Sequence, residues 1–145
     1  AFYADIAGVR EKLGDRAVLR AIHFFADSRR AGALCSAIRE DRFEDFLELI
    51  VAGGHSSFEY NQNAYSAKNP REQGVSLGLA LSQHILEGYG AWRLQGGGFA
   101  GTIQAFVPVH LLEAYRAAMD SVFGEGSCYV LNVRNYGALC VTEVL

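Results

Sequence analysis

The sequence contains little proline, methionine or tryptophan, and it has no long apolar run. Its 145 residues include two prolines, one methionine and one tryptophan. No stretch approaches the roughly 20 apolar residues that a membrane-spanning helix needs, and no signal peptide is visible. No linker or low-complexity tract divides the chain, so residues 1–145 are predicted to form a single domain. We therefore expect a cytoplasmic protein with no membrane partner.

The chain also lacks a strong charge of either sign and any grouped metal ligands. Its formal net charge of −3 excludes the basic surface by which nucleic acid is usually bound. The four histidines have no partner three or four positions away, so no metal site is predicted: His23, His55, His84 and His110. The three cysteines are odd in number and widely spaced, which indicates free thiols that act as small buried apolar residues: Cys35, Cys128 and Cys140.

The first two thirds of the chain carries helical periodicity. Helices are predicted over residues 3–14, 15–39 and from Phe43 onward, where the clearest amphipathic pattern lies. The two arginines Arg29 and Arg30 are expected in solvent, because burying an unpaired guanidinium group is costly. Residues 61–69 are polar and predicted to be a loop. A further helix is expected to begin at Asn69-Pro70 and to end at Gly88.

The last third of the chain changes to strand periodicity. Strands are predicted over residues 89–95, 102–107, 127–133 and 138–144, with a helix over 109–123. Helices followed by such a block indicate an α+β fold. We expect a mostly antiparallel four-stranded sheet with the helices on one face.

The stretch from Leu94 to Thr102 is the most unusual part of the sequence, because four of its residues are glycines. It lacks the Lys-Ser/Thr ending of a Walker A loop, and it joins two strands rather than opening a βαβ unit. Two interpretations stay open on this pattern. The glycines either form a structural hairpin loop or let backbone amides approach an anion. No acid, base and nucleophile can be assembled elsewhere, and adjacent His55 and Ser56 would not face each other on a helix.

The sequence Gly-Ala-Trp-Arg-Leu-Gln-Gly-Gly-Gly-Phe-Ala-Gly-Thr over residues 90–102 resembles the third conserved motif of the GHMP small-molecule kinases, and galactokinase in particular. The helices upstream and the strand segments downstream follow the order of the C-terminal domain of that family, so the resemblance covers roughly residues 15–142. It departs from the family at Ala100, where glycine is usual, and in the loop 61–69, which lacks a Pro-Glu-Leu-Asp segment.

The resemblance implies a ferredoxin-like C-terminal domain of a sugar-1-kinase. The start at Ala1-Phe2-Tyr3 is expected to reflect a cut within a longer chain, although removal of an initiator methionine would give the same start. The N-terminal half of such a kinase, its partner here, carries the sugar motif, the phosphate loop and the catalytic residues. ATP, Mg²⁺ and a galactose-type sugar are therefore expected only in the complete enzyme, and no catalytic or metal-binding residue in this chain. The implied site residues line the substrate and nucleotide pocket: Gly96, Gly97, Gly98, Phe99 and Gly101.

Two other functions are compatible with the same residues. A galactokinase-like protein without activity would act as a sugar sensor or regulator, and a free-standing domain would bind a small metabolite. The sequence upstream of Ala1 would distinguish them, because it would show whether the catalytic Asp and Arg are present. A domain cut from its partner would also expose apolar surface, so self-association is expected.

Overall fold

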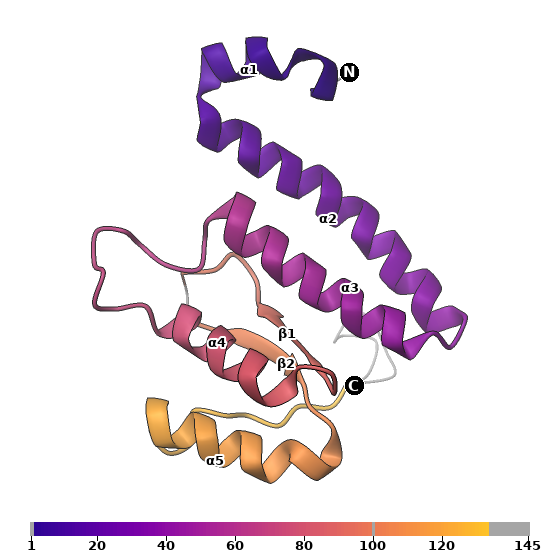
Figure 1. Ribbon diagram of the computed structural model, residues 1–145, viewed down its shortest axis with the longest axis vertical. Coiled ribbons are helices and arrows are strands. Elements are labelled where there is room, and N and C mark those ends of the chain that lie inside the picture. The colour runs from indigo at the N-terminus through magenta and orange to yellow at the C-terminus, as the bar shows by residue number, and fades with distance from the viewer. Residues whose placement is uncertain (1, 100, 134–145) are drawn as a thin grey trace, which may run out of the picture.

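The computed structural model describes residues 2–99 and 101–133 and shows an α+β fold that is mostly helical (Figure 1). The short helices are η1 (Phe2–Asp5), the π-helical η2 (Ser57–Asn61) and η3 (Val109–Leu111). The α-helices are α1 (Ile6–Leu13), α2 (Asp15–Arg39), α3 (Phe43–Ser56), α4 (Gly74–Leu86) and α5 (Leu112–Phe123). The strands are β1 (Ala91–Leu94) and β2 (Ile103–Phe106).

Strands β1 and β2 form an antiparallel hairpin in which Ala91 pairs with Phe106 and Leu94 pairs with Ile103. Helices pack against both of its faces. On one face, the aromatic ring of Phe46 from α3 meets Phe106 edge to face, with the ring centroids 5.2 Å apart. On the other face, Trp92 packs with residues of α4 and α5. The prediction of helices on one face is therefore wrong.

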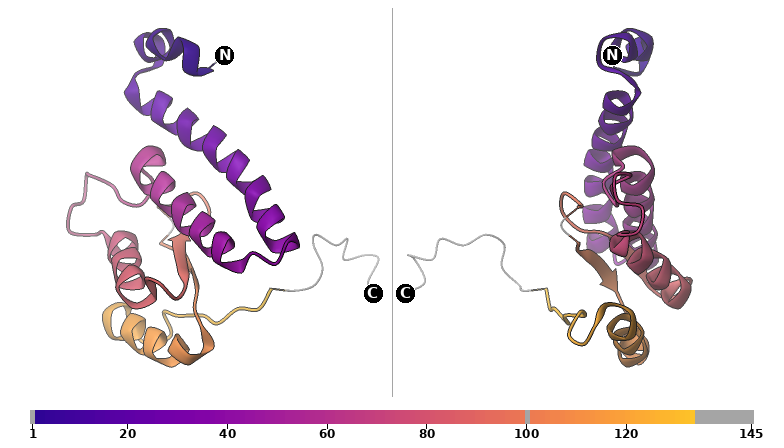
Figure 2. Two further views of the ribbon diagram at one scale, coloured as in Figure 1. Left: turned by 45° about the vertical axis from the view of Figure 1, so that its right-hand side comes forward. Right: turned by 90° about the vertical axis from the view of Figure 1, so that its left-hand side faces the viewer.

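The apolar core lies between the hairpin and the pair α4–α5. Its buried members are Leu86, Trp92, Tyr115 and Met119. Helix α3 covers the opposite face of the hairpin. Helix α2 runs beside α3 on the side away from the hairpin (Figure 2). Helices α1 and α5 lie at opposite ends of the described residues, with α2, α3 and the hairpin between them.

Close packing of α3 on the hairpin depends on Gly54. A Cβ atom placed there would lie 3.1 Å from the carbonyl oxygen of Trp92 and 3.2 Å from the Cα atom of Arg93. The helix continues straight through Gly53 and Gly54 to Ser56. These glycines therefore allow close packing rather than ending the helix.

The prediction of a four-stranded sheet is wrong for the part of the chain that the structure describes, which contains a single two-stranded sheet. Residues 127–133 form no strand there, and Tyr129 and Leu131 are more than 80% exposed. An alternating pattern makes a strand only where a neighbouring strand accepts its hydrogen bonds. The predicted strand at 138–144 lies outside the described residues.

The helix predicted to begin at Asn69-Pro70 begins four residues later, at Gly74. Residues 66–72 form turns instead, in which the amide of Asn69 donates to Ser66 and that of Glu72 donates to Asn69. A proline with its fixed φ suits a turn as well as a helix start. The predicted helix 15–39 and the amphipathic helix that begins at Phe43 are confirmed.

Candidate functional site: the glycine loop between β1 and β2

The glycine loop, defined here as residues 95–99 and 101–102, closes the β1–β2 hairpin. The amide of Gln95 donates to the carbonyl oxygen of Thr102 over 3.2 Å, just beyond the last strand pair. Backbone φ is positive at Gly96, Gly98, Phe99 and Gly101. The loop is therefore a hairpin connection, as the sequence predicted, with a backbone that side-chain-bearing residues rarely adopt.

Gly98 must be glycine because of its neighbours in this chain. Its φ is +74°, and a Cβ atom there would lie 2.2 Å from the backbone oxygen of Asn63 and 2.8 Å from the Asn63 side chain. That approach is closer than any real Cβ contact, and a backbone atom cannot easily move aside. Gly98 therefore fixes the loop against the segment that follows η2.

Gly97 differs from Gly98 in both respects. Its φ is not positive, and no described atom lies within 4 Å of the position its Cβ would occupy. Gly97 is exposed, as is Gly96, and the side chain of Phe99 is about half exposed. Within the described part of the chain, nothing requires a glycine at position 97.

Asn63 connects the glycine loop to the body of the domain. Its side-chain nitrogen donates to the carbonyl oxygen of Gly97 over 3.1 Å, and its backbone oxygen accepts from the amide of Phe99 over 3.0 Å. Its side-chain oxygen accepts from the buried hydroxyl of Ser57 over 3.0 Å. Sequence reasoning missed this residue, because an asparagine in a polar loop gives no signal of burial.

A second polar group lies between α2, α3 and β1. Asp27 of α2 forms an ion pair with Arg30 over 2.5 Å and lies 3.6 Å from the guanidinium group of Arg93 on β1. The prediction that Arg29 and Arg30 lie in solvent holds for Arg29 and is wrong for Arg30, whose side chain is only 14% exposed. Pairing with Asp27 compensates for removing this charge from water.

Among the described residues, His23 is the one histidine whose ring nitrogen has a hydrogen-bond partner, since its Nδ1 atom lies 3.0 Å from Ser56 Oγ. Burial lowers the pKa of His23, Asp27 opposes that shift, and Arg30 and Arg93 add to it. Ser56 thus pairs with His23 of α2 and not with the adjacent His55, as expected for neighbouring positions on a helix. Ser56 is buried and Asp27 is engaged by two arginines, so the pair is a structural contact between α2 and α3.

The thiols also differ from one another. Cys35 is exposed, which contradicts the expectation of a buried residue. Cys128 is half-buried against the apolar core, and burial raises the pKa of its thiol. Cys140 lies outside the described residues.

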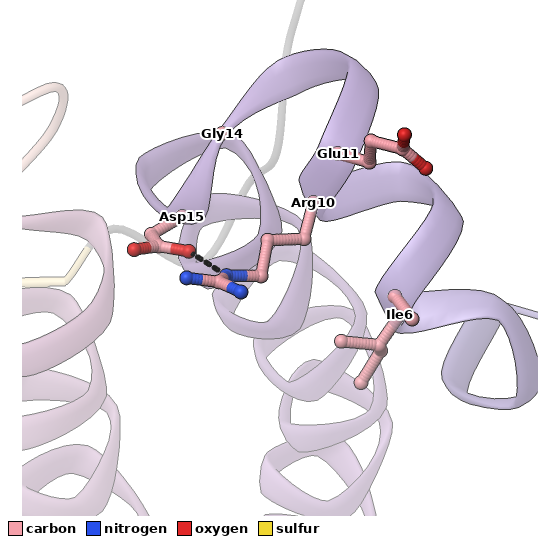
Figure 3. A pocket seen from close by; sticks show the side chains of 6 residues that line it. Ile6, Arg10, Glu11, Gly14 and Asp15 are labelled. Atoms are coloured by element: carbon pink, nitrogen blue, oxygen red, sulfur yellow. Dashed lines mark hydrogen bonds and ion pairs between the residues drawn. The ribbon is translucent and has the colours of Figure 1, made fainter.

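Two hollows on the surface lie away from the glycine loop. One of about 580 Å³ occupies the corner between α1 and α2, where the Arg10 side chain turns toward Asp15 and pairs with it over 2.5 Å (Figure 3). Both side chains are largely exposed, so this pair contributes little stability. Another, of about 810 Å³, lies over α2 and α3 and is lined by Ala33, Ser36, Arg42, Asp45, Glu48, Leu49 and Ala52.

Across residues 2–99 and 101–133, no three His, Cys, Asp or Glu side chains gather in a way that could hold a metal ion. Over the same residues, no helix combines the length and apolar character needed to cross a bilayer. No protein-family model, curated protein or solved structure is significantly similar to this chain. A functional assignment therefore depends on the glycine loop and on how the domain holds it.

Proposed function

We propose that this chain is the C-terminal domain of a galactokinase-like sugar-1-kinase. The observation that carries the proposal is Gly97, which lies in the residues resembling the third GHMP motif. Neither backbone conformation nor a described neighbour requires glycine there. A glycine that its own domain does not need is explained by an outside group that approaches its backbone closely.

In the complete kinase, the γ-phosphoryl group of MgATP would pass to the anomeric hydroxyl of galactose or a related hexose. Such a reaction depends mainly on positioning and on stabilising charge. The contribution of this chain would be one wall of the pocket, made of Gly96, Gly97, Gly98, Phe99 and Gly101. By the resemblance, the catalytic residues and the groups that hold ATP and Mg²⁺ belong to the N-terminal half.

The hairpin geometry supports this role. The loop that resembles the motif extends beyond the last strand pair, with Gly96 and Gly97 exposed. Asn63 and Gly98 lock the opposite side of the loop to the domain. A wall of an active site needs this combination of one fixed side and one open side.

The experiment is a sugar phosphorylation assay on the natural protein that carries this chain, with ATP and a panel of hexoses. We expect a sugar 1-phosphate from galactose or a close relative. The 145-residue chain alone should fold, bind ATP and galactose negligibly, and phosphorylate nothing. Turnover by the chain alone, or a natural protein that transfers phosphate to no sugar, contradicts the proposal.

The same assay separates the kinase from a galactokinase-like sensor. A sensor would bind the sugar, measured by calorimetry, and would transfer no phosphate. A free-standing metabolite-binding domain would instead be stabilised by its ligand as the isolated chain, by about 2.7 kcal/mol at a ligand concentration 100 times Kd.

Self-association of the isolated chain is part of the proposal, because apolar side chains lie exposed on α2 and α3. Phe24, Ile38 and Phe43 are each at least 60% exposed. Burying such surface against a second copy is favourable. Sedimentation at high protein concentration should show oligomers, and a clean monomer would contradict this expectation.

A further inference from the structure

Asn63 is a buried polar residue in a segment whose other polar side chains face solvent. It is 2% exposed, whereas the nearby polar residues Gln62 and Tyr65 are exposed. A buried amide is costly unless each of its polar atoms finds a partner. The partners of Asn63 therefore indicate why the chain places an amide here.

The Asn63 side chain has two partners: it accepts a hydrogen bond from Ser57, and it donates one to Gly97. Ser57, itself buried, donates its hydroxyl to the side-chain oxygen of Asn63 and so fixes which amide atom faces which way. The amide nitrogen then faces the carbonyl oxygen of Gly97 and donates to it. The Gly97 carbonyl is thereby held toward the domain.

Two backbone contacts strengthen this arrangement. The Phe99 amide donates to the Asn63 carbonyl oxygen over 3.0 Å. The Cα atom of Gly98 lies so close to Asn63 that there is no room for a Cβ atom. Asn63 thus contacts three consecutive residues, Gly97 to Phe99, and these contacts restrain the backbone of the glycine loop.

We propose that Asn63 is a positioning residue, supported by Ser57, that turns the Gly97 carbonyl inward and presents the open side of Gly97 to the reacting groups. This inference rests on the proposed sugar-kinase function. Asn63 itself touches no substrate in this account. Its effect passes through the backbone of the glycine loop, where a misplacement of about 1 Å can cost about 100-fold in rate.

The test is Asn63→Asp in the natural protein that carries this chain. Aspartate has nearly the same shape and keeps an oxygen for Ser57, but an ionised carboxylate cannot donate to Gly97. Its second oxygen would repel the Gly97 carbonyl. We expect kcat to fall about 10- to 100-fold near pH 8. Hydrogen exchange at the Phe99 amide should become faster.

The pH profile distinguishes positioning from general support of the fold. A buried carboxyl group has a raised pKa, and its protonated form regains an O–H donor for Gly97. The activity of Asn63→Asp relative to wild type should therefore recover as the pH falls. Asn69→Asp makes the same change at an exposed position in the segment between η2 and α4 that also contains Asn63. The ratio of its activity to that of wild type should stay constant with pH.

Four outcomes decide the inference. Loss of activity with recovery at low pH supports it, and wild-type kcat with an unchanged Phe99 exchange rate overturns it. A loss of activity that is equal at every pH, in a folded protein, also overturns it. If Asn63→Asp does not fold, Ser57→Ala decides. Slower turnover and faster Phe99 exchange are expected in a folded protein, and wild-type values for both contradict the inference.

A failure of the proposed function gives a different result. A natural protein that phosphorylates no sugar refutes the kinase, whatever Asn63 does. The exchange rate of the Phe99 amide in Asn63→Asp still measures whether Asn63 holds the loop, because that readout needs no turnover.

Discussion

The two faces of the β1–β2 hairpin are built from different chemistry. Toward α4 and α5 the hairpin presents Trp92 to an apolar core with Leu86, Tyr115 and Met119. Toward α2 and α3 it presents Arg93 to the carboxylate of Asp27. The first face resembles the interior of any small domain, whereas the opposite face combines the aromatic contact of Phe46 and Phe106 with paired charges.

The contacts that stabilise the hairpin therefore differ from those that position the glycine loop. Apolar contacts are non-directional and tolerate small shifts, so they stabilise the hairpin without fixing the details of its loop. Hydrogen bonds and close backbone contacts are directional, and those of Asn63 and Gly98 fix the glycine loop. We expect substitutions on the apolar side to change stability first and those around Asn63 to change the loop first.

The largest expected loss of stability comes from the apolar side, at Leu86. Its side chain is fully buried, so Leu86→Ala leaves a cavity and should lower the free energy of unfolding by about 2–5 kcal/mol. Urea unfolding measures the change. Leu77→Ala on the same helix is the control, since Leu77 is 48% exposed and should cost about 1 kcal/mol or less. Equal losses at the two positions would remove the distinction between a packed core and its surface.

A smaller loss is expected where α3 contacts the hairpin. Gly54→Ala places a methyl group against the backbone of Trp92 and Arg93, which should outweigh the gain in helix propensity and destabilise the domain by about 1–2 kcal/mol. Gly32→Ala in α2 meets no described atom within 4 Å and should stabilise the domain by about 0.5–1 kcal/mol. Thermal unfolding of the two variants should therefore shift Tm in opposite directions, and a gain at Gly54 would show that α3 is free to move.

The smallest effect is expected at His23, on the polar side. Because folding lowers the pKa of His23, the unfolded chain binds a proton more readily. The neutral ring contributes fully to the stability of the folded domain above the ordinary pKa of 6.5. This contribution is lost as the pH falls from 6.5 toward the lower pKa of the folded state. His23→Gln should flatten the pH dependence of the free energy of unfolding below pH 6.5. An unaltered slope in His23→Gln would show that the ring is not desolvated by folding.

Local patterns predicted much of the fold, because periodicity and turn residues act over short distances. The long helix over 15–39, the amphipathic helix from Phe43 and the hairpin flanking the glycines all follow from such patterns. Residues 127–133 show the limit of this reasoning. Their alternation indicates a strand, but a strand requires a partner that local sequence does not specify.

The site was predictable in part, for a similar reason. The glycine loop is visible as a cluster in the sequence, so it was found, and its hairpin geometry was expected. Asn63 lies 34 residues from Gly97, and only the tertiary fold brings them together. Arg30 was expected in solvent although its partner Asp27 lies only three residues away, because the burial of Arg30 depends on the packing of α2 against α3.

The most direct test of the central claim is Gly97→Val in the natural protein that carries this chain, measured as sugar-dependent phosphate transfer alongside thermal unfolding. Gly97 has an ordinary φ and an open surrounding in the described residues, so the domain should tolerate the side chain and keep its Tm. We predict that kinase activity is lost while the fold is retained. Near-normal turnover would contradict the claim and show that the glycine loop is only a turn between two strands.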